Sequence, residues 1–140
     1  IDEGLVGSEM CIRDRDDIIT APISTDEMLP AVAQGAIGIE RRENDVRIAT
    51  MLEAINNSTT GLLLSAERAF LEALDGSCET PIAGLAELTD GDLRFRGEIL
   101  KTDGTEVYSD EQVASTEDAS LMGIEMAQKL LHKAGDNFFL

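Results

Sequence analysis

A strict two-residue alternation in LRFRGEIL, residues 93–100, is the feature that most constrains the fold of this chain. An extended chain would place Leu93, Phe95, Gly97 and Ile99 on one side and Arg94, Arg96 and Glu98 on the other. Asp-Gly pairs at 90–91 and 103–104 flank the stretch, and such pairs favour tight turns between antiparallel strands. We therefore predict an antiparallel meander of three strands, at residues 82–88, 93–100 and 107–114.

Helical spacing appears before and after the meander. Residues 59–76 carry an apolar stripe at helical spacing, made of Leu63, Ala66, Phe70 and Leu74. Three charged residues, Glu67, Arg68 and Glu72, are expected to face outward, and Gly76 suits the C′ position that ends the helix. A shorter helix, capped by Asn44 or Asp45, is expected before it, with Ile48, Met51 or Leu52, and Ile55 on one face.

A last helix is expected to start within residues 115–118 and to end at Gly135. Its expected apolar face comprises Leu121, Ile124, Met126 or Ala127, Leu131 and Ala134. Helices on one face of a small antiparallel sheet define an α+β domain. Upstream, residues 29–40, LPAVAQGAIGIE, predict a buried strand entered through a glycine-containing turn, and the chain becomes polar at residues 42–45, where we place a domain boundary.

Residues 1–15 show no clear period and join abruptly to residues 16–30, so we expect them to be non-native and Cys11 to be incidental. The native protein would then begin earlier, and a targeting segment would have been lost with it. The present start, IDEGLVGSEM, is acidic and lacks the apolar core of a signal peptide. No apolar run approaches the roughly 20 residues of a membrane span.

The charge balance restricts the partners. There are 11 Lys and Arg residues against 28 Asp and Glu, a formal net charge of -17, which argues against nucleic acid and against acidic membranes. Cys11 and Cys78 could pair in a disulfide, but their separation and the lack of a secretion signal favour free thiols in the cytoplasm or another reducing compartment.

Cys78 is the candidate site, because it lies between turn-forming residues in LDGSCETPI, directly after the predicted long helix. A free cysteine is most often a small buried hydrophobe, and composition alone slightly favours that interpretation. A nucleophilic thiol must be accessible and partly ionised, and a helix-to-strand loop provides the access. No Cys or His stands at zinc-ligand spacing, and the one histidine, His132, predicts no catalytic dyad. Gly35 and Gly38 lack phosphate-loop spacing.

Two motifs resemble the porphobilinogen deaminases, also called hydroxymethylbilane synthases. They are LPAVAQGAIGIE, residues 29–40, and AERAFLEALDGSCETPIAGLAEL, residues 66–88, in the family's order and spacing. The resemblance covers residue 18 to the C-terminus. It implies a transferase of tetrapyrrole (heme) biosynthesis that condenses four porphobilinogen molecules, with loss of ammonia, to hydroxymethylbilane. It also implies that Cys78 holds a dipyrromethane cofactor, on which the product grows, through a thioether.

The resemblance further implies two α/β domains similar to periplasmic binding proteins and a smaller C-terminal α+β domain with the cysteine loop. Residues 16–44 would then end the α/β domains, with the strand at 29–40 running between them, and residues 45–140 would be the C-terminal domain. Most of the active cleft would lie elsewhere, together with the catalytic aspartate and most of the arginines that bind carboxylates. We therefore expect no catalytic residue and no activity in this chain alone, and a monomer for the whole enzyme.

Departures from the family pattern affect the minor sites. Arg41 and Arg42 stand where the family commonly has Cys-Arg, and Ala33 replaces a frequent glycine. The two arginines are candidates for carboxylate binding, although a solvated surface position is favoured for Arg41. Gln34 and Gly35 are candidate cofactor contacts, or alternatively a tight turn packed between domains. Two rival hypotheses are a stand-alone α+β thiol-redox or interaction module that uses Cys78, and a truncated gene product with no role of its own. The absence of a Cys-x-x-Cys pair counts against the redox module.

Overall fold

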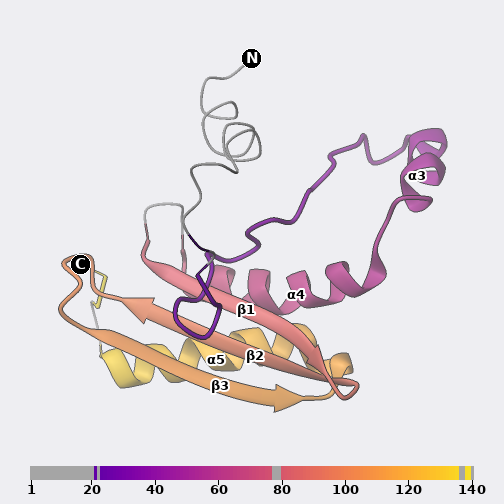
Figure 1. Ribbon diagram of the computed structural model, residues 1–140. Helices are drawn as coiled ribbons and strands as arrows, with labels where there is room; N and C mark the ends of the chain where they lie inside the picture. Colours follow the sequence, from indigo (N-terminus) through magenta and orange to yellow (C-terminus); the bar gives the residue numbers. More distant parts are fainter. Residues whose placement is uncertain (1–20, 22, 77–79, 136–137, 140) are drawn as a thin grey trace.

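The computed structural model describes residues 21, 23–76, 80–135 and 138–139. A three-stranded antiparallel sheet in the order β1-β2-β3 forms its centre, from Ile82–Thr89, Asp92–Leu100 and Val107–Ala114. The helices are α3 (Val46–Glu53), α4 (Ser58–Ala73), a short 3-10 helix η2 (Thr116–Asp118) and α5 (Ala119–Ala134). Figure 1 shows α4 and α5 on one face of the sheet, with α3 apart from it. The predicted α+β class is confirmed.

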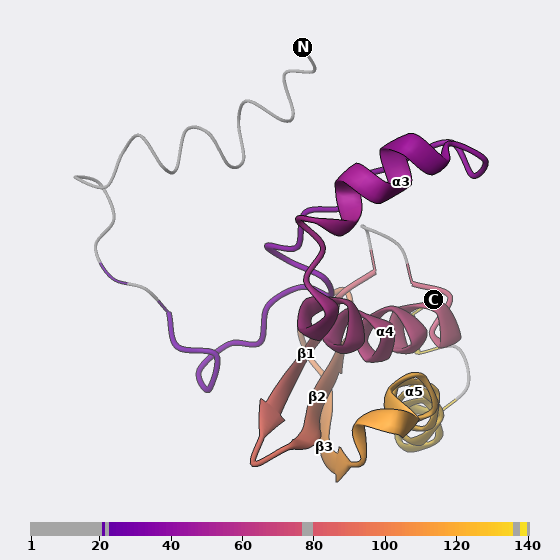
Figure 2. The same cartoon turned by 90° about the vertical axis from the view of Figure 1, so that its right-hand side faces the viewer.

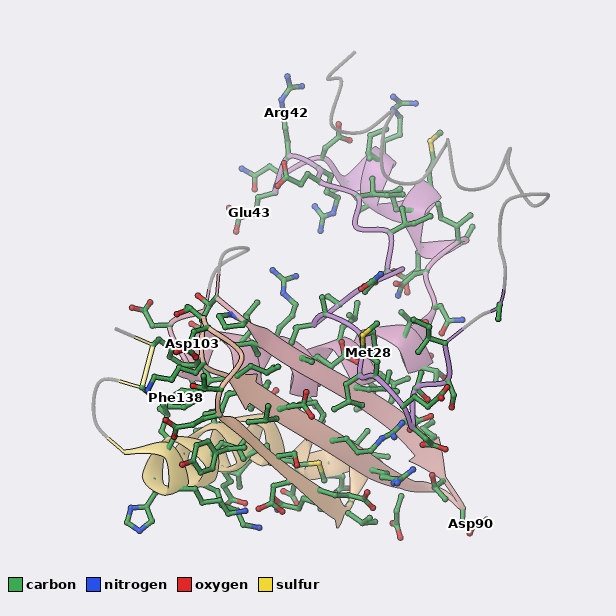
Figure 3. The ribbon with its side chains drawn as sticks, turned by 60° about the vertical axis from the view of Figure 1, so that its left-hand side comes forward. Met28, Arg42, Glu43, Asp90, Asp103 and Phe138 are labelled. Atoms are coloured by element: carbon green, nitrogen blue, oxygen red, sulfur yellow. The ribbon has the colours of Figure 1, made fainter. Side chains whose placement is uncertain are left out.

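The meander forms as predicted. Asp90 and Gly91 both adopt positive φ, 55° and 93°, which is the geometry of a tight two-residue hairpin turn. The second turn closes with the backbone N–H of Gly104 donating to the carbonyl of Lys101 at 2.8 Å. Figure 3 shows Asp90 and Asp103 at opposite ends of the sheet, as a meander of two consecutive hairpins requires.

The core lies between the sheet and the two long helices. Leu93, Phe95 and Ile99, the alternating residues of β2, are fully buried, and the ring of Phe95 meets Phe70 of α4 edge to face at 5.2 Å between centroids. The predicted stripe of α4 faces the core. Gly97 leaves room for the Phe70 ring, since a Cβ there would lie 3.0 Å from Phe70 Cζ. The alternating apolar residues of β2 and the apolar stripe of α4 therefore pack against each other in one layer.

The buried face of α5 differs from the predicted one. The described α5 residues that are buried are Ala119, Met122, Gly123, Met126, Ala127 and Leu130. Leu121 and Ile124 are instead 52% and 38% exposed. The reason is Gly123, which lies against the backbone of α4, so that a Cβ would come within 2.2 Å of the Ala66 carbonyl oxygen. A glycine has no apolar side chain to mark a face, so periodicity alone misplaces this one.

The prediction of a strand at residues 29–40 is wrong for this structure. Residues 31–36 form turns, and Ile37 and Ile39 are 82% and 56% exposed. Within the described part of the chain, the one strand-like pairing of this stretch is an isolated bridge from Ala31 to Ala83. A strand needs a neighbour along its length to satisfy its backbone groups, and residues 36–40 have none among the described segments.

The helix predicted after Asn44 or Asp45 is confirmed as α3, and the Asp45 carboxylate accepts from the N–H of Ile48 at 3.0 Å. It ends before Ile55, which is 69% exposed, and none of its residues is buried. Figure 3 shows Arg42 and Glu43, just ahead of it, far from the sheet. No helix in the described ranges is long and apolar enough to cross a membrane.

The other sheet face carries the segment that precedes the turn at 31–36, as Figure 2 shows. Arg96 of β2 holds it, donating to the Thr25 carbonyl at 3.1 Å and to the Asp26 carboxylate at 2.8 Å. The same guanidinium pairs with Glu87 of β1 at 2.9 Å. The charged face of β2 is therefore partly covered by an upstream segment rather than left to solvent.

Two glycines in helices test the close approach of α5 to α4. Gly123→Ala is expected to lower the free energy of unfolding by about 2–3 kcal/mol, because the new Cβ overlaps the backbone of α4. Gly61→Ala in α4 is the matched control: its Cβ meets no atom within 4 Å. It should stabilise by about 0.5–1 kcal/mol through helix propensity. Urea unfolding of both variants provides the measurement, and equal effects would contradict this packing.

Asp110 of β3 tests the link between the sheet and α5. Its carboxylate accepts from Lys133 and lies 3.0 Å from Lys129 Nζ. The hydrogen bond from Lys133, helped by Lys129, lowers the pKa of Asp110 from 3.8 to about 2. A carboxyl whose pKa is lower in the folded than in the unfolded chain stabilises the fold at any pH above its unfolded-state pKa. This stabilisation is lost as the pH falls towards the folded-state pKa. Here that window runs from pH 3.8 down to about 2.

Asp110→Asn is therefore expected to cost about 1 kcal/mol at neutral pH, discounted for the exposed lysines. It should also flatten the loss of stability across that acid window. Urea midpoints measured along a pH series give the result, with Asp92→Asn, an exposed residue at the start of β2, as the control. Parallel pH curves for wild type and Asp110→Asn would argue against the pairing.

Candidate functional site

The loop that contains Cys78 is held at its start by the end of α4. Cys78 itself, with Ser77 and Glu79, lies outside the described residues. The N–H of Asp75 donates to the Glu72 carbonyl at 3.0 Å, and that of Gly76 to the Leu71 carbonyl at 3.0 Å. Asp75 takes the left-handed conformation, φ 51°. This pair of bonds is a Schellman motif with Asp75 at C′, so the assignment of Gly76 to C′ is corrected by one residue.

Gly76 has a different role, which is close packing. A Cβ at this position would lie 2.6 Å from Leu71 Cδ1 and 2.7 Å from Ile82 Cδ1. The residue before the loop is therefore pressed between the helix end and the start of β1. A glycine is the residue that fits such a contact.

The loop is also held at its far end. The Pro81 carbonyl accepts from the N–H of Leu100 at 3.0 Å, which attaches it to β2, and Ile82 enters the core with 8% exposure. Only residues 77–79 separate the described Gly76 and Thr80. The sequence therefore places Cys78 in a short connection between two anchored ends.

Gln34 and Gly35 lie in a compact turn. The Gln34 N–H donates to the Ala31 carbonyl at 3.0 Å, and the Gln34 side-chain oxygen accepts from the Ala31 N–H at 3.2 Å. Gly35 and Ala33 have positive φ, 82° and 61°. Both Gln34 and Gly35 are exposed. The tight-turn alternative therefore describes the geometry, and the turn leaves both residues accessible.

This turn is attached to β1, the strand that comes after the Cys78 loop. The N–H of Gly84 donates to the Pro30 carbonyl at 3.1 Å, next to the Ala31 to Ala83 bridge. Val32 packs over Gly84, where a Cβ would lie 3.3 Å from Val32 Cγ2. The two candidate sites are thus connected to the same edge strand.

Glu67 does not lie where its sequence pattern predicts. It was expected to face outward, but it is 6% exposed. Its Oε2 accepts from the N–H of Ala33 at 2.7 Å, and its Oε1 accepts from the N–H of Ala86 at 3.0 Å. Helical spacing could have indicated that Glu67 is buried, since it adjoins Ala66 and lies three residues before Phe70 on the apolar side of α4. A charged residue there requires buried donors, which only the folded chain provides.

The basic side chains of the sheet and α5 are engaged with the protein's own carboxylates. Arg94 forms a two-point pair with Glu111, at 2.9 and 2.7 Å, and this hydrogen bonding raises the pKa of Arg94. Lys101 bonds Glu106 at 3.0 Å, which lowers the pKa of the Glu106 carboxyl. These cations neutralise local charge rather than forming an open patch for an anionic ligand.

Two other candidates remain, and one of them, Arg41, lines a cleft together with Gly35. Arg41 donates to the carbonyls of Arg42 and Glu43, at 3.1 and 2.8 Å, and is exposed. His132 is exposed near the end of α5. The described residues contain no cluster of three or more His, Cys, Asp or Glu able to hold a metal ion. A cleft of about 580 Å³ runs beside residues 35–41 and the start of α4, lined by Ile37, Leu52 and Leu64 among others.

The fold and the loop define a small α+β domain that carries a cysteine between a helix and the first strand of a meander. Residues 62–132 match the family model described as porphobilinogen deaminase, C-terminal domain. Residues 9–50 match the model of the dipyrromethane cofactor binding domain of the same enzyme. The chain belongs to the porphobilinogen deaminase family.

Curated relatives agree with this assignment. The porphobilinogen deaminase of Paracoccus denitrificans is 54% identical over 117 residues, which are 84% of this chain and 37% of the relative. That of Nitrobacter hamburgensis is 46% identical over 123 residues, 88% of this chain and 39% of the relative. The chloroplastic porphobilinogen deaminase of Pisum sativum is 48% identical over 124 residues, which are 86% of this chain and 34% of the relative. The chain therefore spans less than two-fifths of the length of these relatives.

The strained turn at Ala33 provides a test of the site geometry. Ala33→Gly is expected to stabilise the fold by about 0.5–1 kcal/mol, because glycine adopts positive φ without the Cβ penalty. Asp75→Gly is the matched control, also at positive φ, and should gain less because aspartate tolerates this conformation better. Denaturant unfolding measures both. A loss of stability in Ala33→Gly would contradict the left-handed turn.

Proposed function

We propose that this chain is the cofactor-anchoring part of a hydroxymethylbilane synthase, with Cys78 as the anchor. The whole protein would condense four porphobilinogen molecules, with release of ammonia, into hydroxymethylbilane. The observation that carries the proposal is the GSCETP loop, residues 76–81, held between α4 and β1 in a chain of this family. Porphobilinogen is a small molecule that contains a pyrrole ring and two carboxylates.

The chemistry of the loop fits a covalent pyrrole cofactor. A thiol is a soft nucleophile in its ionised form, and a thioether resists hydrolysis through repeated reaction cycles. When bound, the dipyrromethane supplies the pyrrole end on which the product grows. The anchored residues Gly76 and Pro81 restrict where the attached group can reach.

We also propose that Gln34 and Gly35 contact the cofactor. Both are exposed, and both lie in a turn attached to β1. The Gln34 backbone N–H and side-chain oxygen are both used within the turn, so we assign the Gly35 backbone and the Gln34 side-chain NH2 group to this contact. Most carboxylate-binding arginines would be supplied by other parts of the enzyme, because Arg94, Arg96 and Lys101 are paired internally.

The domain organisation is part of the proposal. Residues 16–44 would end the α/β domains and residues 45–140 would form the C-terminal domain, while the assignment of residues 1–15 as non-native rests on their sequence alone. The exposed Ile37 and Ile39 support packing of this stretch against further domains. We place no catalytic residue in this chain and expect none of the overall activity from it alone. The whole enzyme would be a cytoplasmic monomer without nucleic-acid or membrane partners. The net charge of -17 on this chain argues only against nucleic acid and acidic membranes.

Intact mass spectrometry tests the anchor. The chain, together with whatever coding sequence flanks it in its gene, is produced in cells that make porphobilinogen, beside a Cys78→Ser variant. The wild type should carry the added mass of a dipyrromethane and colour with an acidic aldehyde reagent for pyrroles, and Cys78→Ser should show neither. An unmodified wild-type protein would remove this mechanism and favour a redox or structural role for the thiol.

A further inference from the structure

Glu67 is the one charged residue that the fold buries within the described part of the chain. Burying a carboxylate is costly unless its oxygens accept hydrogen bonds. No lysine or arginine of the described segments forms an ion pair with it, so the compensation comes from backbone donors. The buried carboxylate of Glu67 therefore depends on the backbone groups to which it is hydrogen-bonded.

The two oxygens of Glu67 join segments that are far apart in sequence. Oε2 accepts from Ala33, 34 residues earlier, and Oε1 accepts from Ala86, 19 residues later. Since β1 is an edge strand of the described sheet, its outward backbone groups have no strand partner there, and the Glu67 carboxylate accepts from one of them. The turn at residues 31–36 is thereby connected, through one side chain of α4, to the strand that leaves the Cys78 loop.

We propose that Glu67 is a positioning residue, whose carboxylate fixes the turn carrying Gln34 and Gly35 to the body that carries the Cys78 loop. The turn with Gln34 and Gly35 and the attachment point at Cys78 then move together while the product lengthens. The functional meaning of this coupling rests on the proposed function. The mechanical coupling is a property of the described residues and is tested separately.

Two further observations support a rigid connection. The left-handed Ala33, φ 61°, is a strained conformation for a residue with a Cβ, and its N–H is the group that Glu67 binds. The preceding segment is held as well, by Gly84 at Pro30 and by Arg96 at Asp26. Beyond residue 36 the buried contacts end, since Ile37 and Ile39 are exposed. The body that carries the Cys78 loop therefore extends upstream to about residue 25 and excludes α3.

Amide hydrogen exchange tests the coupling. In Glu67→Gln the new NH2 group faces a backbone donor, so exchange at residues 31–36 should accelerate at least about tenfold, relative to the amides of β2. Glu72→Gln, an exposed residue on the same helix, is the matched control and should change neither region. Equal acceleration of the turn and of β2, as in general unfolding, would overturn the proposal, and so would unchanged exchange in the turn.

Turnover of the complete enzyme tests the positioning role. In Glu67→Gln, kcat per molecule of attached cofactor should fall about tenfold while the mass of the Cys78 adduct is unchanged. Adding Ala33→Gly, which removes the strain on the turn, should restore part of the loss. If the fall in activity is explained by a smaller amount of folded or cofactor-loaded protein, Glu67 contributes to stability alone and the positioning role is overturned. The same conclusion follows if Ala33→Gly restores none of the lost kcat. A wild type without the adduct would instead refute the proposed function, which separates the two failures.

Discussion

The close contact between α4 and α5 is the constraint on which the rest of the fold depends. A three-stranded sheet has one apolar face, and two helices must share it without leaving a gap. Gly123 permits this because α5 can approach the backbone of α4 at Ala66 without an intervening side chain. Phe70 then reaches the space above Gly97 and meets Phe95. Both ends of the Cys78 loop are fixed as a consequence, since one is the end of α4 and the other the start of β1.

The edge of β1 is where structure and proposed function meet. An exposed strand edge invites pairing with other chains, and this protein covers it with an upstream segment and a buried carboxylate. The same contacts bring the turn with Gln34 and Gly35 to the strand that comes after Cys78. An arrangement that protects the sheet edge therefore also organises the candidate cofactor contacts around one strand.

The charged side chains also bear on the proposed function. The chain carries a net charge of -17, which is unfavourable for attracting an anionic ligand. The described cations of the sheet and α5 mainly pair with nearby carboxylates, as Arg94 does with Glu111 and Lys133 with Asp110. With these cations paired, the described part of the chain offers little attraction for an anionic substrate, and this agrees with the proposed role of holding a covalent group.

Local periodicity and turn chemistry determined much of the fold from the sequence alone. The Asp90-Gly91 turn, the alternation along β2 and the stripe on α4 each specify one element by contacts within a few residues. The family was also readable, because the motifs at 29–40 and 66–88 are specific. Only the tertiary structure decided what lies between elements: the inward Glu67, the face of α5 set by Gly123, and the turn in place of a strand at residues 29–40. Each depends on a partner far away in sequence, and a periodic pattern contains no information about such a partner.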